Sequence, residues 1–185
     1  AGHSLGEYSA LVAAGCLRFE DAVLLVHKRG RYMQEAVPVG VGGMAAVLGV
    51  PGDVVGSHLA AVRSGVVEIA NWNSEDQIVI SGDKAAVEEA LAAIKAPKSV
   101  LLPVSAPFHS RLMKPAEDRL AADLDAVPFA DPRFPIITNV EARLIRTGAE
   151  ARDALKRQVS RSVLWTKSMA ALRDLAVEAC VECGP

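Results

Sequence analysis

The chain has 185 residues, of which 51% are hydrophobic and 23% are charged, and its formal net charge is −2. This composition is typical of a globular chain with one sizeable core and excludes a disordered one. The small net charge gives no electrostatic reason to expect a nucleic-acid partner. No apolar run reaches the roughly 20 residues that cross a bilayer. Three cysteines are too few for a disulfide framework and indicate a reducing compartment. From these observations together we expect a cytoplasmic protein without a membrane partner.

The first six residues, Ala1-Gly2-His3-Ser4-Leu5-Gly6, contain a Gly-x-Ser-x-Gly pentapeptide with a helix-forming segment directly behind it. In this arrangement the serine lies on a strained strand-to-helix turn, where the flanking glycines avoid side-chain clashes. The N–H of Leu5, at the helix N-terminus, is then able to bind a developing oxyanion. The pattern predicts a serine nucleophile at Ser4. Such a turn also needs a strand before it, which this chain lacks, so we expect the chain to be a piece of a longer protein with little activity by itself.

Helical and strand patterns alternate along the rest of the chain. Helices are expected at residues 5–14, 21–36, 53–63, 84–95, 115–126, 149–159 and 167–175, and strands at 42–50, 66–70, 77–81, 99–104, 135–138 and 176–181. The β-α-β-β-α-β order between Gly42 and Val104 is the ferredoxin-like arrangement. We therefore predict an α/β core formed by residues 1–38 and 104–185, with a small ferredoxin-like α+β domain, residues 39–103, inserted into it.

Arg29 is the second informative residue, because it falls in the middle of the apolar stripe of its predicted helix. A guanidinium cannot lose its proton and is costly to bury unless a carboxylate or phosphate faces it. Two partners fit this pattern: a structural Asp or Glu, or the carboxylate of a ligand. A serine nucleophile just before this helix favours the ligand.

His109 follows a predicted strand, at the return from the inserted domain, and the chain has four histidines. The others are placed less well: His3 flanks the serine, His27 lies on a polar helix face and His58 belongs to the small domain. A serine hydroxyl needs a general base at neutral pH. We predict that His109 faces Ser4 across a cleft as this base.

The Cys180-x-x-Cys183 pair resembles half of a zinc or redox site, but no second pair or nearby histidine completes it. We interpret it as a buried strand with two small apolar thiols, and we predict no metal site.

Several segments together resemble the malonyl-CoA:acyl carrier protein transacylase family, to which the acyltransferase domains of polyketide and fatty acid synthases are related. They are Gly2-His3-Ser4-Leu5-Gly6-Glu7-Tyr8-Ser9-Ala10-Leu11, Arg29-Gly30, Gln34-Glu35-Ala36, Asn71-Trp72-Asn73-Ser74, Gln77-Ile78-Val79-Ile80-Ser81-Gly82 and Ala106-Pro107-Phe108-His109-Ser110. The resemblance covers essentially the whole chain. It implies an α/β-hydrolase-like core with the ferredoxin-like insertion.

The resemblance also implies roles for individual residues. Ser4 matches the acylated nucleophile, His109 its base and Arg29 the clamp for the malonyl carboxylate. The substrate-binding set is completed by Leu5, Phe108, Met33 and Asn73. The implied partners are malonyl-CoA and an acyl carrier protein, with coenzyme A and phosphopantetheine entering as parts of substrates, no further cofactor and a monomeric state if the enzyme is free-standing.

Two rival functions remain from the residues alone. A serine esterase or thioesterase would take its acid from Asp53, Asp76 or Asp83, which lie between Ser4 and His109 in the chain. All three belong to the predicted insertion, and a neutral-ester hydrolase has no use for Arg29. A non-catalytic module that docks carrier proteins would keep the fold without needing the serine, histidine and arginine together.

Overall fold

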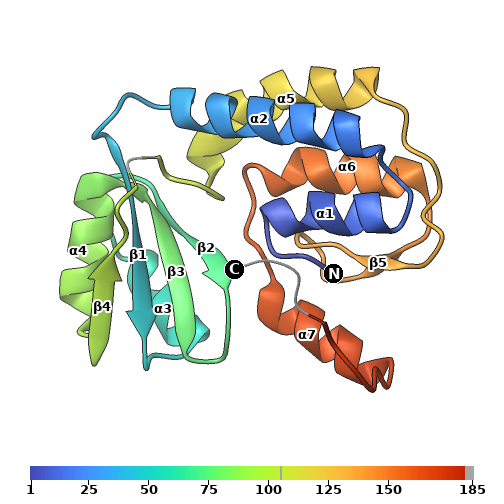
Figure 1. Cartoon of the computed structure of the whole chain (residues 1–185). Coiled ribbons are helices and arrows are strands. Elements are labelled where there is room, and N and C mark those ends of the chain that lie inside the picture. The colour runs from blue at the N-terminus through green and yellow to red at the C-terminus, as the bar shows by residue number, and fades with distance from the viewer. Residues whose placement is uncertain (105, 182–185) are drawn as a thin grey trace.

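The computed structural model describes residues 1–104 and 106–181 and shows a mixed α/β chain in two parts (Figure 1). One part contains the four-stranded sheet with two helices; the other contains the remaining helices and a short two-stranded sheet. The elements are α1 (Leu5–Ala13), α2 (Phe19–Glu35), β1 (Gly42–Leu48), α3 (Gly52–Leu59), β2 (Val67–Trp72), β3 (Gln77–Asp83), α4 (Lys84–Ile94), β4 (Lys98–Leu101), a 3-10 turn η1 (Arg111–Met113), α5 (Lys114–Ala126), β5 (Ile136–Ile137), β6 (Leu144–Ile145), α6 (Gly148–Gln158) and α7 (Trp165–Asp174).

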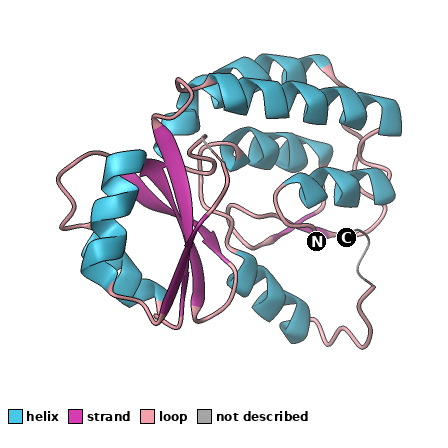
Figure 2. Cartoon of the chain, turned by 60° about the vertical axis from the view of Figure 1, so that its left-hand side comes forward, coloured by secondary structure: helices cyan, strands magenta, loops and turns pink. Residues whose placement is uncertain are grey.

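The larger sheet has the strand order β2-β3-β1-β4, and each neighbouring pair is antiparallel. Alternate residues of β1 and β3 point to one face, where they pack with α3 and α4 in a core of Val47, Val55, Ile80, Val87 and other apolar residues. The opposite face carries a smaller apolar group and looks toward the helical part of the molecule (Figure 2). The predicted β-α-β-β-α-β element order is confirmed.

The helical part has its own core, formed by the apolar stripes of α1, α2, α5 and α6. Tyr8, Leu25, Leu120 and Leu155 lie in it and are 0–2% exposed. Burying a side chain of this size fully stabilises the fold by about 1.5–3 kcal/mol. Helix α6 begins with a capping box, in which Thr147 and Glu150 bond each other's backbone N–H groups. These helices therefore fix the positions of Ser4, directly before α1, and of Arg29, within α2.

The two parts are joined by backbone hydrogen bonds as well as by the connecting segments of the chain. Residue Val163, just before α7, pairs with β2: its N–H donates to Ala70 O at 2.8 Å, and Trp72 N–H donates to Val163 O at 2.9 Å. The β2 ladder shifts register between Ile69 and Asn71 at this place. A bulge of this kind re-aims the strand, and here it does so beside the helical part.

The expected elements differ most from the structure at three places, and strand β6 was not expected at all. Residues 176–181, expected as a buried final strand, are irregular, and Val177 and Val181 are exposed. A strand requires a neighbour for its backbone groups, and no strand within residues 1–104 and 106–181 pairs with this segment. Strand β4 ends at Leu101 and helix α3 at Leu59, both earlier than expected.

Candidate active site

Ser4 lies directly before α1 with φ 50° and ψ −107°, a conformation that costs a non-glycine residue about 1–3 kcal/mol. A Cβ added at Gly2 would lie 2.0 Å from Gly6 O, so this position requires glycine. A Cβ added at Gly6 would meet no described atom within 4 Å apart from the adjoining backbone of its own helix. Of the two glycines expected to relieve clashes, only Gly2 does so, because the backbone of α1 passes against it and leaves Gly6 facing open space.

Asn139 holds the strained turn in place. This buried residue follows β5, and its Oδ1 accepts the Ser4 N–H at 2.6 Å while its Nδ2 donates to Gly2 O at 2.7 Å. Both bonds use the backbone on the N-terminal side of the strained position. No periodic pattern marks Asn139, because it lies in an irregular segment, and its partner Ser4 is 135 residues away in the chain.

His109 meets Ser4 although it lies 105 residues away in the chain: Nε2 lies 2.7 Å from Ser4 Oγ, and Nδ1 lies 2.9 Å from the backbone oxygen of Gln158. A carbonyl oxygen only accepts, so Nδ1 carries the proton and Nε2 accepts from the serine hydroxyl. Burial, and next the Arg29 charge, lower the pKa of His109 to about 3. The imidazole is therefore neutral at pH 7, the form that a general base requires.

The hydrogen bond to Gln158 O also bears on the esterase alternative. Both ring nitrogens of His109 are occupied, by Ser4 and by a backbone carbonyl, so the place of a triad acid is taken by a neutral group. Two of the proposed acids are engaged elsewhere: Asp76 accepts from Ser74 Oγ and Asp83 from Val66 N–H. The geometry is that of a Ser-His dyad.

Arg29 reaches the same point from α2 and is only 7% exposed. Its Nη2 donates to Ser4 Oγ at 2.8 Å and to Gln158 Oε1 at 3.2 Å, whereas its buried Nε has no partner. No carboxylate lies within 4.0 Å of this guanidinium in the part of the chain that the structure describes. Of the two partners that the sequence left open, a structural ion pair is therefore not seen.

A buried network that the sequence analysis missed supports these three residues. Gln158 Nε2 donates to Ser4 O at 3.0 Å and to Glu7 Oε2 at 2.7 Å. Glu7 is 1% exposed, and its burial raises its pKa to about 7. One signal in the sequence pointed to Gln158. It is a polar residue on the apolar stripe of Ala151, Ala154 and Leu155, just as Arg29 is a charged residue on the apolar stripe of α2.

Ser4, Arg29 and His109 line a mostly apolar cavity of about 320 Å³ between the helical part and the free face of the sheet. Met33 and Phe108, both predicted to bind substrate, also line it. The remaining lining residues are His3, Gly30, Met44, Asn71, Leu102 and Val104. Asn73 does not line the cavity and reaches it only through His3, whose Nε2 lies 2.9 Å from Asn73 Oδ1. Asn71, two residues earlier in the chain, lines the cavity where Asn73 was expected.

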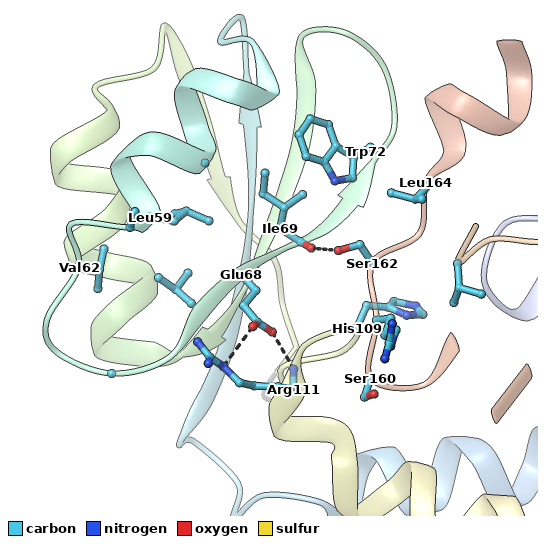
Figure 3. Close-up of a pocket in the computed structure, with 16 residues that line it drawn as sticks. Leu59, Val62, Glu68, Ile69, Trp72, His109, Arg111, Ser160, Ser162 and Leu164 are labelled. Atoms are coloured by element: carbon cyan, nitrogen blue, oxygen red, sulfur yellow. Dashed lines mark hydrogen bonds and ion pairs between the residues drawn. The ribbon is translucent and has the colours of Figure 1, made fainter. Parts of the chain in front are cut away.

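A wider groove of about 920 Å³ lies on the other side of His109 (Figure 3). It runs between α3 and β2 on one side and residues 160–164 on the other. Arg111 Nε lies 3.1 Å from the Glu68 carboxylate beside it, and Ser162 Oγ donates to Ile69 O across it. His109 thus has one cavity on each side.

The structure also bears on the expectations about metal sites, cysteines and membrane segments. No group of three or more His, Cys, Asp or Glu side chains able to hold a metal occurs among residues 1–104 and 106–181. Cys180 is exposed, which corrects its interpretation as part of a buried strand, while Cys183 lies outside the described residues. Within the same limits, no helix is long and apolar enough to cross a membrane.

Comparisons with known proteins agree with one another. The malonyl CoA-acyl carrier protein transacylase of Escherichia coli O157:H7 is 48% identical over 189 residues, which cover 100% of this chain and 61% of that protein. The solved acyl-carrier-protein S-malonyltransferase from Burkholderia pseudomallei 1710b matches with a TM-score of 0.96 at 45% identity, over 99% of this chain and 61% of that one.

A further solved structure holds a type II PKS acyl-carrier protein in complex with its malonyl-transacylase. It matches with a TM-score of 0.92 at 41% identity, over 95% of this chain and 58% of that one. The chain thus spans about 61% of the length of the curated relatives that it matches. The model of the acyl transferase domain family matches residues 1–185. The chain therefore belongs to the acyl transferase domain family.

Proposed function

We propose that this chain carries the catalytic residues of an enzyme that moves a malonyl group from coenzyme A to the phosphopantetheine thiol of an acyl carrier protein, in fatty acid or polyketide biosynthesis. One observation carries the proposal: the buried Arg29 guanidinium lies 2.8 Å from Ser4 Oγ without a carboxylate partner in the described part of the chain. A charge placed there selects an acyl group that brings its own carboxylate. The names of the relatives support the same substrate and acceptor.

In the first half-reaction, His109 Nε2 takes the Ser4 hydroxyl proton while Oγ attacks the malonyl thioester carbonyl. The N–H of Leu5, in the first turn of α1, stabilises the oxyanion. The C–S bond then breaks, and the proton passes from His109 to the departing sulfur of coenzyme A. The carboxylate bound to Arg29 offsets the charge that helps to lower the pKa of His109, so the correct substrate strengthens the base.

In the second half-reaction, the phosphopantetheine thiol gives its proton to His109 and attacks the malonyl-serine ester. The C–O bond breaks and the proton returns to Ser4 Oγ, which restores the enzyme. His109 lines both cavities. We assign the smaller cavity, which Ser4 and Arg29 also line, to the acyl group and the wider groove to the thioester arm. Coenzyme A and phosphopantetheine are then substrates, and no further cofactor takes part.

Met33 and Phe108 shape the acyl pocket in this proposal, and Asn73 acts through His3. We also assign residues 1–38 and 104–185 to an α/β-hydrolase-like core and residues 39–103 to a ferredoxin-like insertion. The strand order β2-β3-β1-β4 supports the insertion, and the strained turn at Ser4 supports the core. The proposed enzyme works in the cytoplasm, as a monomer where it is free-standing.

The test is covalent labelling of the natural full-length protein with malonyl-CoA, followed by intact mass and peptide mapping. We expect one malonyl group on Ser4, none on Ser4→Ala, and acylation slowed by about 10²–10⁴-fold in His109→Ala because the base is lost. Malonylation that persists in Ser4→Ala would exclude the assignment.

A further inference from the structure

Glu7 is a buried carboxyl group that the mechanism above does not use. It lies in the first turn of α1, three residues after Ser4, and is 1% exposed. A carboxyl group is almost never buried to this extent without partners. Its Oε2 accepts two hydrogen bonds, from Gln158 Nε2 at 2.7 Å and from Asn139 N–H at 3.1 Å. Both partners are themselves bonded to the Ser4 turn.

The bond from Gln158 decides how that side-chain amide is turned. An amide has a donor end and an acceptor end, and here three acceptors surround the donor end: Glu7 Oε2 at 2.7 Å, Ser4 O at 3.0 Å and Asn139 Oδ1 at 3.4 Å. Glu7 is the nearest of them. Reversing the amide would set its oxygen against three oxygens and its NH₂ group against the guanidinium of Arg29.

The acceptor end of the same amide therefore faces Arg29. Among the described residues, Arg29 Nη2 donates to two acceptors, Gln158 Oε1 at 3.2 Å and Ser4 Oγ at 2.8 Å. Between them they hold the guanidinium beside the nucleophile. Glu7 does not touch Arg29 directly, but a chain of two hydrogen bonds through Gln158 connects the two charged groups.

We propose that Glu7 is a positioning residue for selecting acyl groups with a free carboxylate: by accepting from Gln158 it turns the amide oxygen toward Arg29 and holds the guanidinium at the acyl pocket. This role rests on the proposed function, since it acts through Arg29. It differs from a purely structural role, because its loss weakens the binding of a carboxylated acyl group more than that of an uncharged one.

The test compares Glu7→Met with Glu7→Gln in the natural full-length protein. The two side chains have similar length, but only glutamine can place an oxygen acceptor toward Gln158. In Glu7→Met the amide loses its nearest acceptor. We expect KM for malonyl-CoA to rise by about 10- to 100-fold, the effect of one hydrogen bond to a charged group. Transfer from acetyl-CoA changes less, and Glu7→Gln recovers most of the malonyl loss.

Several outcomes would overturn the proposal. It fails if Glu7→Met leaves the malonyl KM unchanged, or if malonyl and acetyl transfer fall by the same factor in both variants. If Glu7→Met does not fold, Gln158→Met removes the same connection from its other end, and an unchanged malonyl KM in that variant refutes the role. Failure of the proposed function is separate: a wild-type protein that transfers no malonyl overturns both.

Discussion

Replacing Arg29 with alanine separates a ligand clamp from a structural charge. In the described part of the chain the guanidinium has two hydrogen bonds, a partnerless Nε and no carboxylate within 4.0 Å. The substitution therefore loses about 1.5–3 kcal/mol for each of these hydrogen bonds, because the donor is charged. It also removes a buried charge, whose desolvation costs several kcal/mol. The two effects oppose each other, so the free energy of unfolding should change little or rise.

Activity should respond very differently. If Arg29 binds the malonyl carboxylate, its truncation costs about 2–5 kcal/mol in kcat/KM, which corresponds to about 30- to 5000-fold. Transfer from acetyl-CoA should not fall and should even rise, because an uncharged acyl group no longer faces an unanswered charge. The Arg29→Met variant, which fills more of the space, checks that a cavity is not the cause.

The assay measures melting temperature and both transfer rates on the same preparations, with the exposed Arg18→Ala as the control. In a chain of this size, 1 kcal/mol shifts the melting temperature by about 2–4 °C. A melting temperature that falls by many degrees, with malonyl and acetyl transfer falling together, would refute the clamp and show that the charge is structural.

Two further predictions concern stability. Gly2→Ala should destabilise the protein and abolish Ser4 acylation, because its Cβ would lie 2.0 Å from Gly6 O, whereas Gly6→Ala should melt at the same temperature or higher; equal melting temperatures for the two variants would contradict this. The pKa of His109 is lowered from 6.5 to about 3, so the unfolded state binds the extra proton and stability is lost as the pH falls below 6.5, by about 1.4 kcal/mol per unit. The pKa of Glu7 is raised from 4.5 to about 7, so its contribution has the opposite sign and stability is lost as the pH rises from 4.5 to 7. Urea unfolding between pH 5 and 7 should therefore show that His109→Asn is more stable at pH 5 than at pH 7 and Glu7→Gln the reverse; slopes identical to wild type in both variants would refute the assignment.

Local signals explain what the sequence predicts well. The Gly-x-Ser-x-Gly turn and the charge on the apolar stripe of α2 are both contained within a few residues, and so are the patterns of most helices and strands. No local pattern identifies Ser4 as the partner of Asn139 or of Gln158, because these hydrogen bonds span 135 and 154 residues. The final apolar segment, residues 176–181, fits a strand by composition, but composition does not supply the neighbour that a strand requires.

The backbone pairing at Val163 has a consequence for protein engineering. An exchange of the small sheet between related enzymes would naturally be cut at the two chain connections, near Pro38 and Pro103. The sheet is attached at a third place, where Ala70 and Trp72 bond Val163 and Thr166 Oγ1 donates to Trp72 O at 2.9 Å. A chimera that keeps residues 162–166 from the same parent as the sheet preserves this seam. A chimera that takes residues 162–166 and the sheet from different parents pairs two surfaces that did not evolve together.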